Sequence, residues 1–280
     1  MKKRRRAKKA ILGIIISIAL VIVLGVTNVV PYFSVIPDMV KVGIDYISLD
    51  RNPDFPDEKE IKEALTENTE KKHPFILADS ADFDKVREEY RTKKHTPYTE
   101  KLLKYVLSNA DALLDMSIYP PMDYVLDEED SILPISREVI CRMVILGYAW
   151  QITGEEKYAE RAKAEIEKVC SYDDWCTSHF LATAEMALAV SIGYDWFYDY
   201  LDEATKALME EKMWNYAINS ALDDNHWFTW SKNNWNSICY SGIGIACMTF
   251  ADYDTDRACE FLSMCYENMP VPFENFTPDG

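Results

Sequence analysis

The stretch Ser178–Leu201, SHFLATAEMALAVSIGYDWFYDYL, decides the fold class of this 280-residue chain. Its apolar part, Phe180–Ile192, contains one charged side chain, Glu185, and has no polar face. A helix that is apolar all round must be buried on all sides. The segment Ile238–Ala251 repeats the pattern without any charge. These two segments predict inner helices of a large all-helical domain.

Each buried segment has an amphipathic partner after a short turn. Three segments have the pattern of an apolar helix, a turn and an amphipathic helix with one polar side: residues 136–169, 178–217 and 236–269. Repeated pairs of a buried inner helix and an amphipathic outer helix are typical of an α/α toroid or a helical solenoid. We expect an all-α, incomplete α/α toroid built of helical hairpins, with residues 82–91 and 98–115 as the first pair. A plain helical bundle is the alternative.

The N-terminal segment indicates attachment to a membrane. Residues 1–9 carry seven basic side chains, and residues 10–30 form an apolar run long enough to cross a bilayer. The run is not followed by a cleavage site of small residues, as in a cleaved signal peptide. This favours a single-pass signal anchor. Basic residues mark the cytoplasmic side, so the rest of the chain is expected to be extracytoplasmic. Residues 31–72 predict a polar linker, and residues 73–280 the toroid domain.

The charge of the chain limits its partners. The formal net charge is -17, and it is more negative still without the basic N-terminus. Such a surface does not attract nucleic acid. It also repels acidic polysaccharides at long range, so an anionic substrate needs a local basic or amide-lined site.

The seven cysteines lack the spacing and the histidine partners of a zinc site, so we expect no metal and no cofactor. Most of them fall in apolar helical segments and predict buried thiols. A disulfide between Cys170 and Cys176 is the alternative outside the cytoplasm.

The stretch Trp230–Gly242, WSKNNWNSICYSG, is the strongest candidate for a binding site. The loops before inner helices converge at one mouth of a toroid, and this stretch precedes the last inner helix. One N-cap would explain one of its asparagines but not all three. Side-chain amides bind sugar hydroxyls and carboxylates, and tryptophan faces stack on sugar rings.

Other residues before inner helices are weaker candidates. His179 could act as an acid or base near neutral pH or could be structural. Arg142 is expected to pair internally with Glu138 or Glu185. Ser136 and Ser178 are expected to be helix N-caps.

Several motifs resemble the heparinase II/III-like polysaccharide lyases, including the related alginate lyases, over roughly residues 73–280. They are HPFILADSADFDKVR (73–87), LGYAWQITGEEKYAERA (146–162), SHFLATAEMALAVSIGYDWFYDYL (178–201), NNWNSIC (233–239) and PDG (278–280).

The resemblance implies an α/α toroid followed by a β-sandwich, and cleavage of uronic-acid polysaccharides by β-elimination. Asn234 matches the asparagine that neutralises the uronate carboxylate. The family has a histidine next, where this chain has Trp235, so His179 or His226 is expected to substitute. The tyrosine of the family is expected beyond Gly280, so we expect this chain to be a fragment.

The predicted function is therefore a lyase that acts on an acidic polysaccharide or oligosaccharide. A toroid glycoside hydrolase using Asp174 with Asp195 or Glu185, and a non-catalytic cell-surface glycan-binding protein, are the alternatives. The predicted catalytic residues are Asn234 and His179, and the predicted substrate-binding residues are Asn233, Trp235, Asn236, Trp230, Arg137 and His226.

Overall fold

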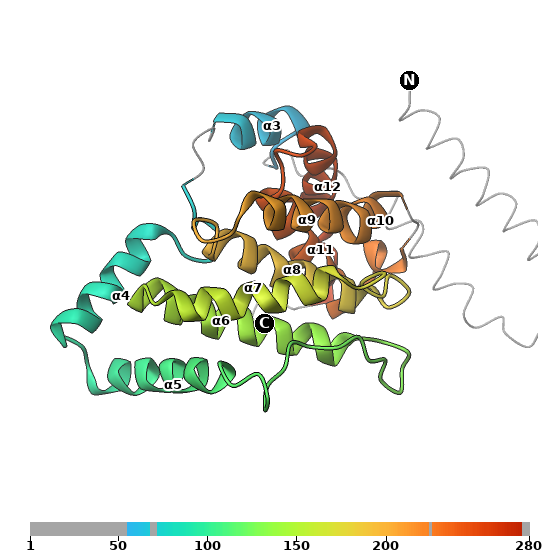
Figure 1. Ribbon diagram of the computed structural model, residues 1–280. Coiled ribbons are helices and arrows are strands. Elements are labelled where there is room, and N and C mark those ends of the chain that lie inside the picture. The colour runs from blue at the N-terminus through green and yellow to red at the C-terminus, as the bar shows by residue number, and fades with distance from the viewer. Residues whose placement is uncertain (1–54, 68–71, 224–225, 276–280) are drawn as a thin grey trace, which may run out of the picture. The chain divides into compact units, whose positions relative to one another are not determined.

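The structure is a computed structural model that describes residues 55–67, 72–223 and 226–275 (Figure 1). All regular secondary structure in these residues is helical, which confirms the all-α prediction. None of these helices is long and apolar enough to cross a membrane. The predicted basic segment 1–9 and membrane helix 10–30 lie outside the described residues.

The chain divides into two units, Met1–Asp50 and Arg51–Gly280, and every described residue belongs to the second. The helices of this unit are α3 (Glu58–Glu67), α4 (Ser80–Thr92), α5 (Pro97–Leu113), α6 (Leu133–Thr153), α7 (Glu156–Cys170), α8 (Phe180–Trp196), α9 (Glu203–Met213), η1 (Trp214–Ile218), α10 (Asn219–Asp223), η2 (Trp227–Trp230), α11 (Asn234–Thr249), α12 (Thr255–Asn268) and η3 (Val271–Asn275).

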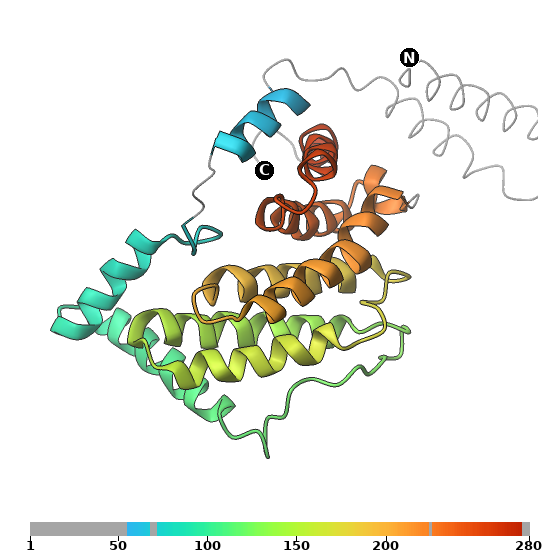
Figure 2. The same ribbon diagram turned by 45° about the horizontal axis from the view of Figure 1, so that its top comes forward.

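The predicted inner helices lie next to one another, with α8 packed against both α6 and α11 (Figure 2). Every residue of α8 is buried except Glu185 and Leu188, as its all-apolar sequence predicts.

The hydroxyl of Ser136 donates to the Ala182 carbonyl near the start of both α6 and α8. Ser136 is therefore not the predicted N-cap. Since Gln151 donates to the Trp196 carbonyl at their other ends, α6 and α8 run parallel.

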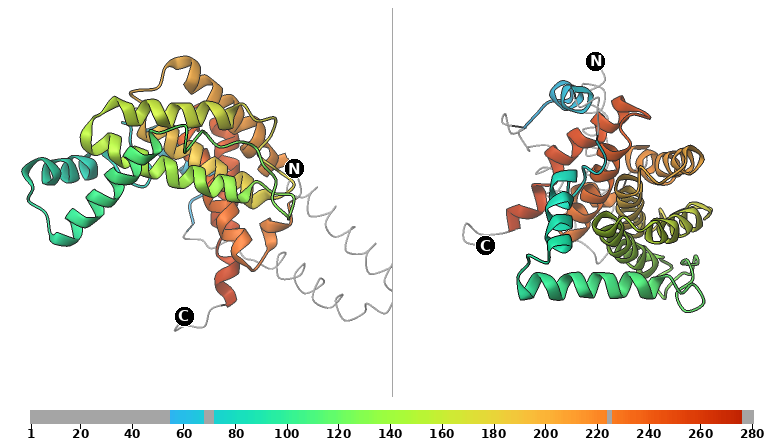
Figure 3. Two further views of the ribbon diagram at one scale, coloured as in Figure 1. Left: turned by 60° about the horizontal axis from the view of Figure 1, so that its bottom comes forward. Right: turned by 60° about the vertical axis from the view of Figure 1, so that its left-hand side comes forward.

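The amphipathic helices take the outer positions. In the predicted hairpins, α7 packs on α6, α9 on α8 and α12 on α11, while α7 and α9 also contact each other (Figure 3). Helix α9 continues into the π-helix η1 and then into α10, which the sequence pattern does not predict. Single π-helical turns of this kind widen a helix locally and often occur near functional sites.

A buried carboxylate fixes the long loop between α5 and α6. Glu165 of α7 has a fully buried side chain and accepts hydrogen bonds from Arg142 at 3.0 Å and Arg161 at 2.9 Å. Its other oxygen accepts from the Met122 backbone N–H at 2.7 Å. Arg142 also donates to the Pro120 carbonyl at 2.7 Å. Because charges away from water must be neutralised locally, this network ties the loop to the core.

A second buried carboxylate anchors the start of the predicted domain. Asp195, in the last turn of α8, accepts from the backbone N–H groups of Phe75 at 2.8 Å and Ile76 at 2.9 Å. Its other oxygen lies 2.6 Å from Nδ1 of His73. Charge-assisted hydrogen bonds of this kind are strong, so His73 is fixed to the core where the sequence predicts the domain to begin.

The described part of the predicted linker, residues 55–67 and 72, includes a packed helix. Helix α3 lies against α12, and Lys62 forms an ion pair with Asp256. The aromatic ring of Phe55 lies 5.8 Å from that of Tyr266 in α12. The part from Phe55 to the end of α3 is therefore docked on the helical domain and is not a free spacer.

Candidate functional site

Three loops meet at the end of the unit where the inner helices begin. We call this region the mouth and define it as residues 114–132, 171–180 and 226–235, which comprise the loops before α6, α8 and α11 and the first residues of α8 and α11. The first two loops are joined by Tyr124, whose hydroxyl donates to Asp174 at 2.9 Å. The third loop joins them through His226, whose ring lies 4.1 Å from that of Phe180. The prediction that loops before the inner helices converge is confirmed for these residues.

The three asparagines of the stretch Trp230–Gly242 have three different environments. Asn233 is the N-cap of α11, since its side chain accepts from the Trp235 backbone N–H at 3.0 Å and from the Ser231 hydroxyl at 2.8 Å. Asn234 is exposed, and its side chain makes no hydrogen bond to any other residue that the structure describes. Of the three, Asn234 alone presents an exposed amide that has no structural role in the described part of the chain.

Asn236 is not placed as a substrate-binding residue, which corrects the sequence prediction. Its side chain is fully buried, and its amide nitrogen donates to the Asn268 carbonyl at the end of α12 over 3.3 Å. Its amide nitrogen also donates to the Thr229 carbonyl of the mouth over 3.5 Å, and its Oδ1 atom is buried without a partner among the described residues. Asn236 therefore holds the hairpin of α11 and α12 together.

The tryptophans of the mouth form a small aromatic surface. The ring of Trp235 lies 4.7 Å from that of Trp227 and 4.9 Å from that of His179. Trp227 is 46% exposed, whereas Trp230 and Trp235 are half-buried. Aromatic faces that are partly open to water can stack on the apolar face of a sugar ring. The sequence stretch predicts Trp230 and Trp235 in this role but does not single out Trp227.

His179 is the titratable side chain that touches this aromatic surface. It stands immediately before α8 and does not cap that helix with its side chain. The ring is half-buried, and its Nδ1 atom is buried without a hydrogen-bond partner among the described residues. Buried polar atoms are rarely left unpaired, and unpaired ones concentrate at functional sites. An imidazole in this position could take up or release a proton from a bound molecule.

Two other predicted substrate-binding residues already have protein partners. His226 Nε2 lies 3.1 Å from the Ser220 carbonyl oxygen, and its ring packs against Phe180 and Phe228, so its role is structural. Arg137 donates from Nε and Nη2 to both oxygens of Glu185, at 2.9 Å and 3.1 Å. This hydrogen-bonded pairing raises the pKa of Arg137 and neutralises its charge. Both side chains are thus bound to protein groups, whereas the Asn234 side chain makes no hydrogen bond in the described part of the chain.

Two of the carboxylates considered for hydrolysis, Asp174 and Asp195, do not form a pair. Asp174 adjoins the first turn of α8, where Thr183 donates to the Trp175 carbonyl at 2.8 Å, and Asp195 lies in the last turn. The rise of about 1.5 Å per residue separates the helix ends by roughly 20 Å. Two catalytic carboxylates of a glycosidase stand about 5–10 Å apart. Asp174 and Asp195 therefore cannot flank one glycosidic bond.

The ion pair predicted for Arg142 is confirmed with Glu138 at 2.9 Å. Its second carboxylate partner is Glu165 and not Glu185, which the sequence pattern alone does not reveal. Ser178 does not cap α8 either, because the N-cap position belongs to His179. All seven cysteines are free thiols, so the alternative of a Cys170–Cys176 disulfide is not observed.

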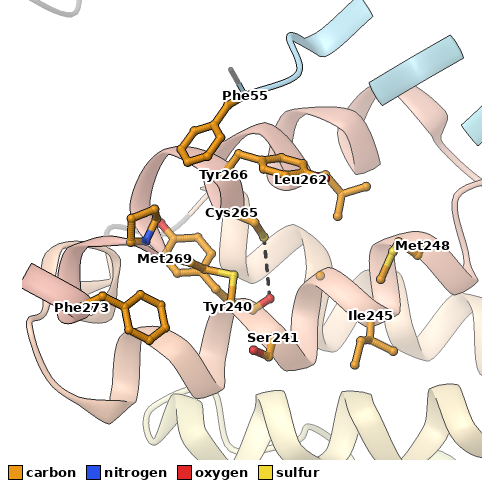
Figure 4. Close-up of a pocket in the computed structure, with 12 residues that line it drawn as sticks. Phe55, Tyr240, Ser241, Ile245, Met248, Leu262, Cys265, Tyr266, Met269 and Phe273 are labelled. Carbon is orange, nitrogen blue, oxygen red and sulfur yellow. Dashed lines mark hydrogen bonds between the residues drawn. The ribbon is translucent and has the colours of Figure 1, made fainter. Parts of the chain in front are cut away.

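One hollow is lined in part by mouth residues, and another lies away from them. A polar one of about 370 Å³ adjoins the loop before α8. It is lined by Asp174, Thr177, Asn215, Tyr216, Asn219, Ser220 and Asp223. An apolar one of about 420 Å³ lies between α11, α12 and η3 (Figure 4). Cys265 donates to the Tyr240 carbonyl there, and the lining offers little for polar chemistry.

Within the described ranges, no group of three or more His, Cys, Asp or Glu side chains is arranged to hold a metal ion. Comparison with known proteins gives no matching family model and no matching curated protein. The site is therefore interpreted from the chemistry of its own residues.

Proposed function

We propose that the helical hairpins are part of an α/α toroid and that the mouth binds an acidic polysaccharide, which the protein cleaves by β-elimination. The proposal combines the resemblance of the sequence to heparinase II/III-like lyases with the parallel packing of the inner helices. We further propose that a membrane anchor at residues 10–30 holds this domain outside the cytoplasm.

The observation that supports the site most strongly is that the exposed Asn234 side chain makes no hydrogen bond to any described residue. Its neighbour Asn233 satisfies the helix N-terminus, so the Asn234 amide is available for a ligand. Helix N-termini favour negative charge through their backbone N–H groups and the helix dipole. A carboxylate bound at the start of α11 would meet both the amide of Asn234 and this field.

In the proposed reaction a base removes the C5 proton of a uronate residue, the C4–O bond breaks to leave a C4–C5 double bond, and the leaving oxygen takes up a proton from the protonated base or from water. Asn234 donates hydrogen bonds to the uronate carboxylate, which takes up negative charge as the proton leaves. His179 is the proposed base because its half-buried ring touches Trp235 beside Asn234. Trp227 and Trp235 orient the sugar by stacking.

The test uses the 280-residue chain in detergent with alginate, polygalacturonate and heparin. We expect a rise in ultraviolet absorbance from the new double bond with at least one polymer. Asn234→Ala should remove it, and Asn233→Ser, which keeps the helix cap without adding charge, should not. A folded protein that yields no unsaturated product from any uronate polymer would contradict the proposed reaction.

A second candidate is a glycan-binding protein without catalysis. The contact of Trp235 with both His179 and Trp227 favours it, because these rings build a binding platform that needs no proton transfer. Binding of a uronate polymer that is lost in Trp235→Ala, with no product formed by the parent protein, would identify this function.

A further inference from the structure

A group of lysines without ion partners lies at the turn between α4 and α5. Lys93, Lys94, Lys101 and Lys104 are exposed and form no ion pair with any residue in the described part of the chain. Most other described cations are paired, as Lys163 is with Asp202. In a chain with a formal net charge of -17, uncompensated positive charge at one place is unusual and attracts anions locally.

The same helix exposes a stripe of large apolar side chains. Tyr98, Leu102 and Tyr105 are 71%, 46% and 61% exposed. Their spacing of four and three residues places them on one face of α5. The opposite face buries Leu103 and Ala110 in the core. The stripe is therefore a second apolar face of α5 that the described residues leave uncovered.

A hollow of about 540 Å³ with a mixed polar and apolar lining separates α4 from α5 beside these lysines. It is lined by Lys93 and Lys104, by the carboxylates of Glu100 and Asp111, by Tyr90, His95 and Ser108, and by the apolar side chains of Leu103 and Leu107. A volume of this size is within the range of small-ligand sites. A mixed lining of ammonium, carboxylate, hydroxyl and aromatic groups can bind both the hydroxyls and the carboxylate of an acidic sugar.

This surface lies at the opposite end of the hairpins from the mouth. Arg87 of α4 donates to the Gln151 carbonyl near the end of α6, whereas the mouth is formed where α6 begins. Figure 1 shows the connection between α4 and α5 far from the loops that precede α8 and α11. A molecule that occupies both regions must be long.

We infer that the lysines, the Tyr98–Leu102–Tyr105 stripe and the adjoining hollow form a second binding surface for an acidic polysaccharide. The choice of polymer rests on the proposed function, and the surface itself is defined by its charge and exposure. It supplies the local basic site that an acidic chain needs to hold an acidic polymer. Tyrosine faces and a hollow with a mixed lining fit sugars better than lipid, since α5 offers only Leu102 as an exposed aliphatic side chain.

The experiment measures binding of fluorescein-labelled alginate and heparin to the 280-residue chain in detergent. In Lys101→Gln/Lys104→Gln we expect affinity about fivefold weaker, the factor for two exposed ionic contacts, and a weaker dependence on salt. Tyr98→Ala/Tyr105→Ala should weaken binding at all salt concentrations. The matched control Lys59→Gln/Lys72→Gln removes two exposed charges elsewhere and should bind as the parent does.

Three outcomes would overturn the inference. They are unchanged affinity in the lysine variant, equal binding of neutral dextran, and displacement of the polymer by micelles of short-chain phosphatidylglycerol but not phosphatidylcholine. The last would identify a membrane surface as the partner. The variant Asn234→Ala distinguishes a failure of this inference from a failure of the proposed reaction. It should lose product formation but keep the salt-dependent binding at α5.

Discussion

Gly242 of α11 and Ala184 of α8 meet backbone to backbone: a Cβ atom on Gly242 would lie 2.3 Å from the Ala184 carbonyl oxygen. No side chain can move aside to relieve this contact. We therefore expect Gly242→Ala to lower the free energy of unfolding by about 3 kcal/mol, the upper end for overpacking, as measured by urea denaturation.

Gly244→Ala provides the control, because its Cβ would meet only the Cys265 sulfur at 3.3 Å and Leu262 at 3.9 Å. The better helix propensity of alanine, about 1 kcal/mol, should offset that contact. Equal destabilisation by both substitutions would show that the inner helices do not pack as described.

Glu165→Gln should be strongly destabilising, because it leaves Arg142 and Arg161 buried beside a neutral amide. Loss of one member of a buried ion network costs about 3–5 kcal/mol. Glu138→Gln removes the other partner of Arg142, but the Glu138 side chain is 45% exposed, so a loss below about 1 kcal/mol is expected. Urea denaturation measures both variants. Limited proteolysis should also show faster cleavage between α5 and α6 in Glu165→Gln alone.

Asp202 is expected to contribute to stability above its ordinary pKa and to lose this contribution in acid. The hydrogen bond from Lys163, followed by those from Thr205, lowers the pKa of Asp202 below its ordinary value of 3.8. Since the folded state binds this proton more weakly than the unfolded state, stability falls as the pH drops through and below that value. Asn also caps helices well, so Asp202→Asn keeps the cap of α9 and removes the charge.

The unfolding free energy of Asp202→Asn should therefore change less between about pH 6 and about pH 3 than that of the parent. Urea titrations at the two pH values measure the difference. An equally steep acid loss in both proteins would exclude this carboxylate as a source of the pH dependence.

Thiol reagents should label Cys141 rapidly in the folded protein and the other cysteines slowly. Cys141 is exposed and the remaining six are buried. Burial also raises the pKa of Cys170 to about 12, so little reactive thiolate forms near neutral pH. Mass spectrometry after brief alkylation should find one modified site, and denaturation before alkylation should give seven. Fast labelling of Cys170 in the folded state would contradict the packing of α7.

The helices can be predicted from the sequence, because a helix buried on all sides has few or no charged residues. The charge-free run of α11 and the single Glu185 of α8 indicate inner helices without any knowledge of their neighbours. Local signals also set boundaries: Gly154 adopts a positive φ of 70° after α6, where the sequence places a turn.

Contacts between distant parts of the chain could not be predicted in this way. Glu165 looks like an ordinary charge of an amphipathic helix, and only the fold shows that it meets two arginines and the loop at Met122. The docking of α3 on α12 could not be predicted for the same reason, since the polar sequence of α3 resembles a linker. For the candidate site, the sequence identifies the asparagine stretch, but only packing decides which amide faces solvent.

The three asparagines allow the site to be separated from the scaffold. Asn236→Ala should lower the free energy of unfolding by about 1–3 kcal/mol, because it removes a buried hydrogen bond to the Asn268 carbonyl. Asn233→Ala should cost about 1 kcal/mol through loss of the helix cap. Asn234→Ala should leave stability unchanged and weaken binding of a uronate polymer. Thermal unfolding and polymer binding, measured on the same samples, test this order. If Asn234→Ala is destabilised but binds the polymer normally, Asn234 is part of the scaffold, and the mouth lacks the residue proposed to bind the uronate carboxylate.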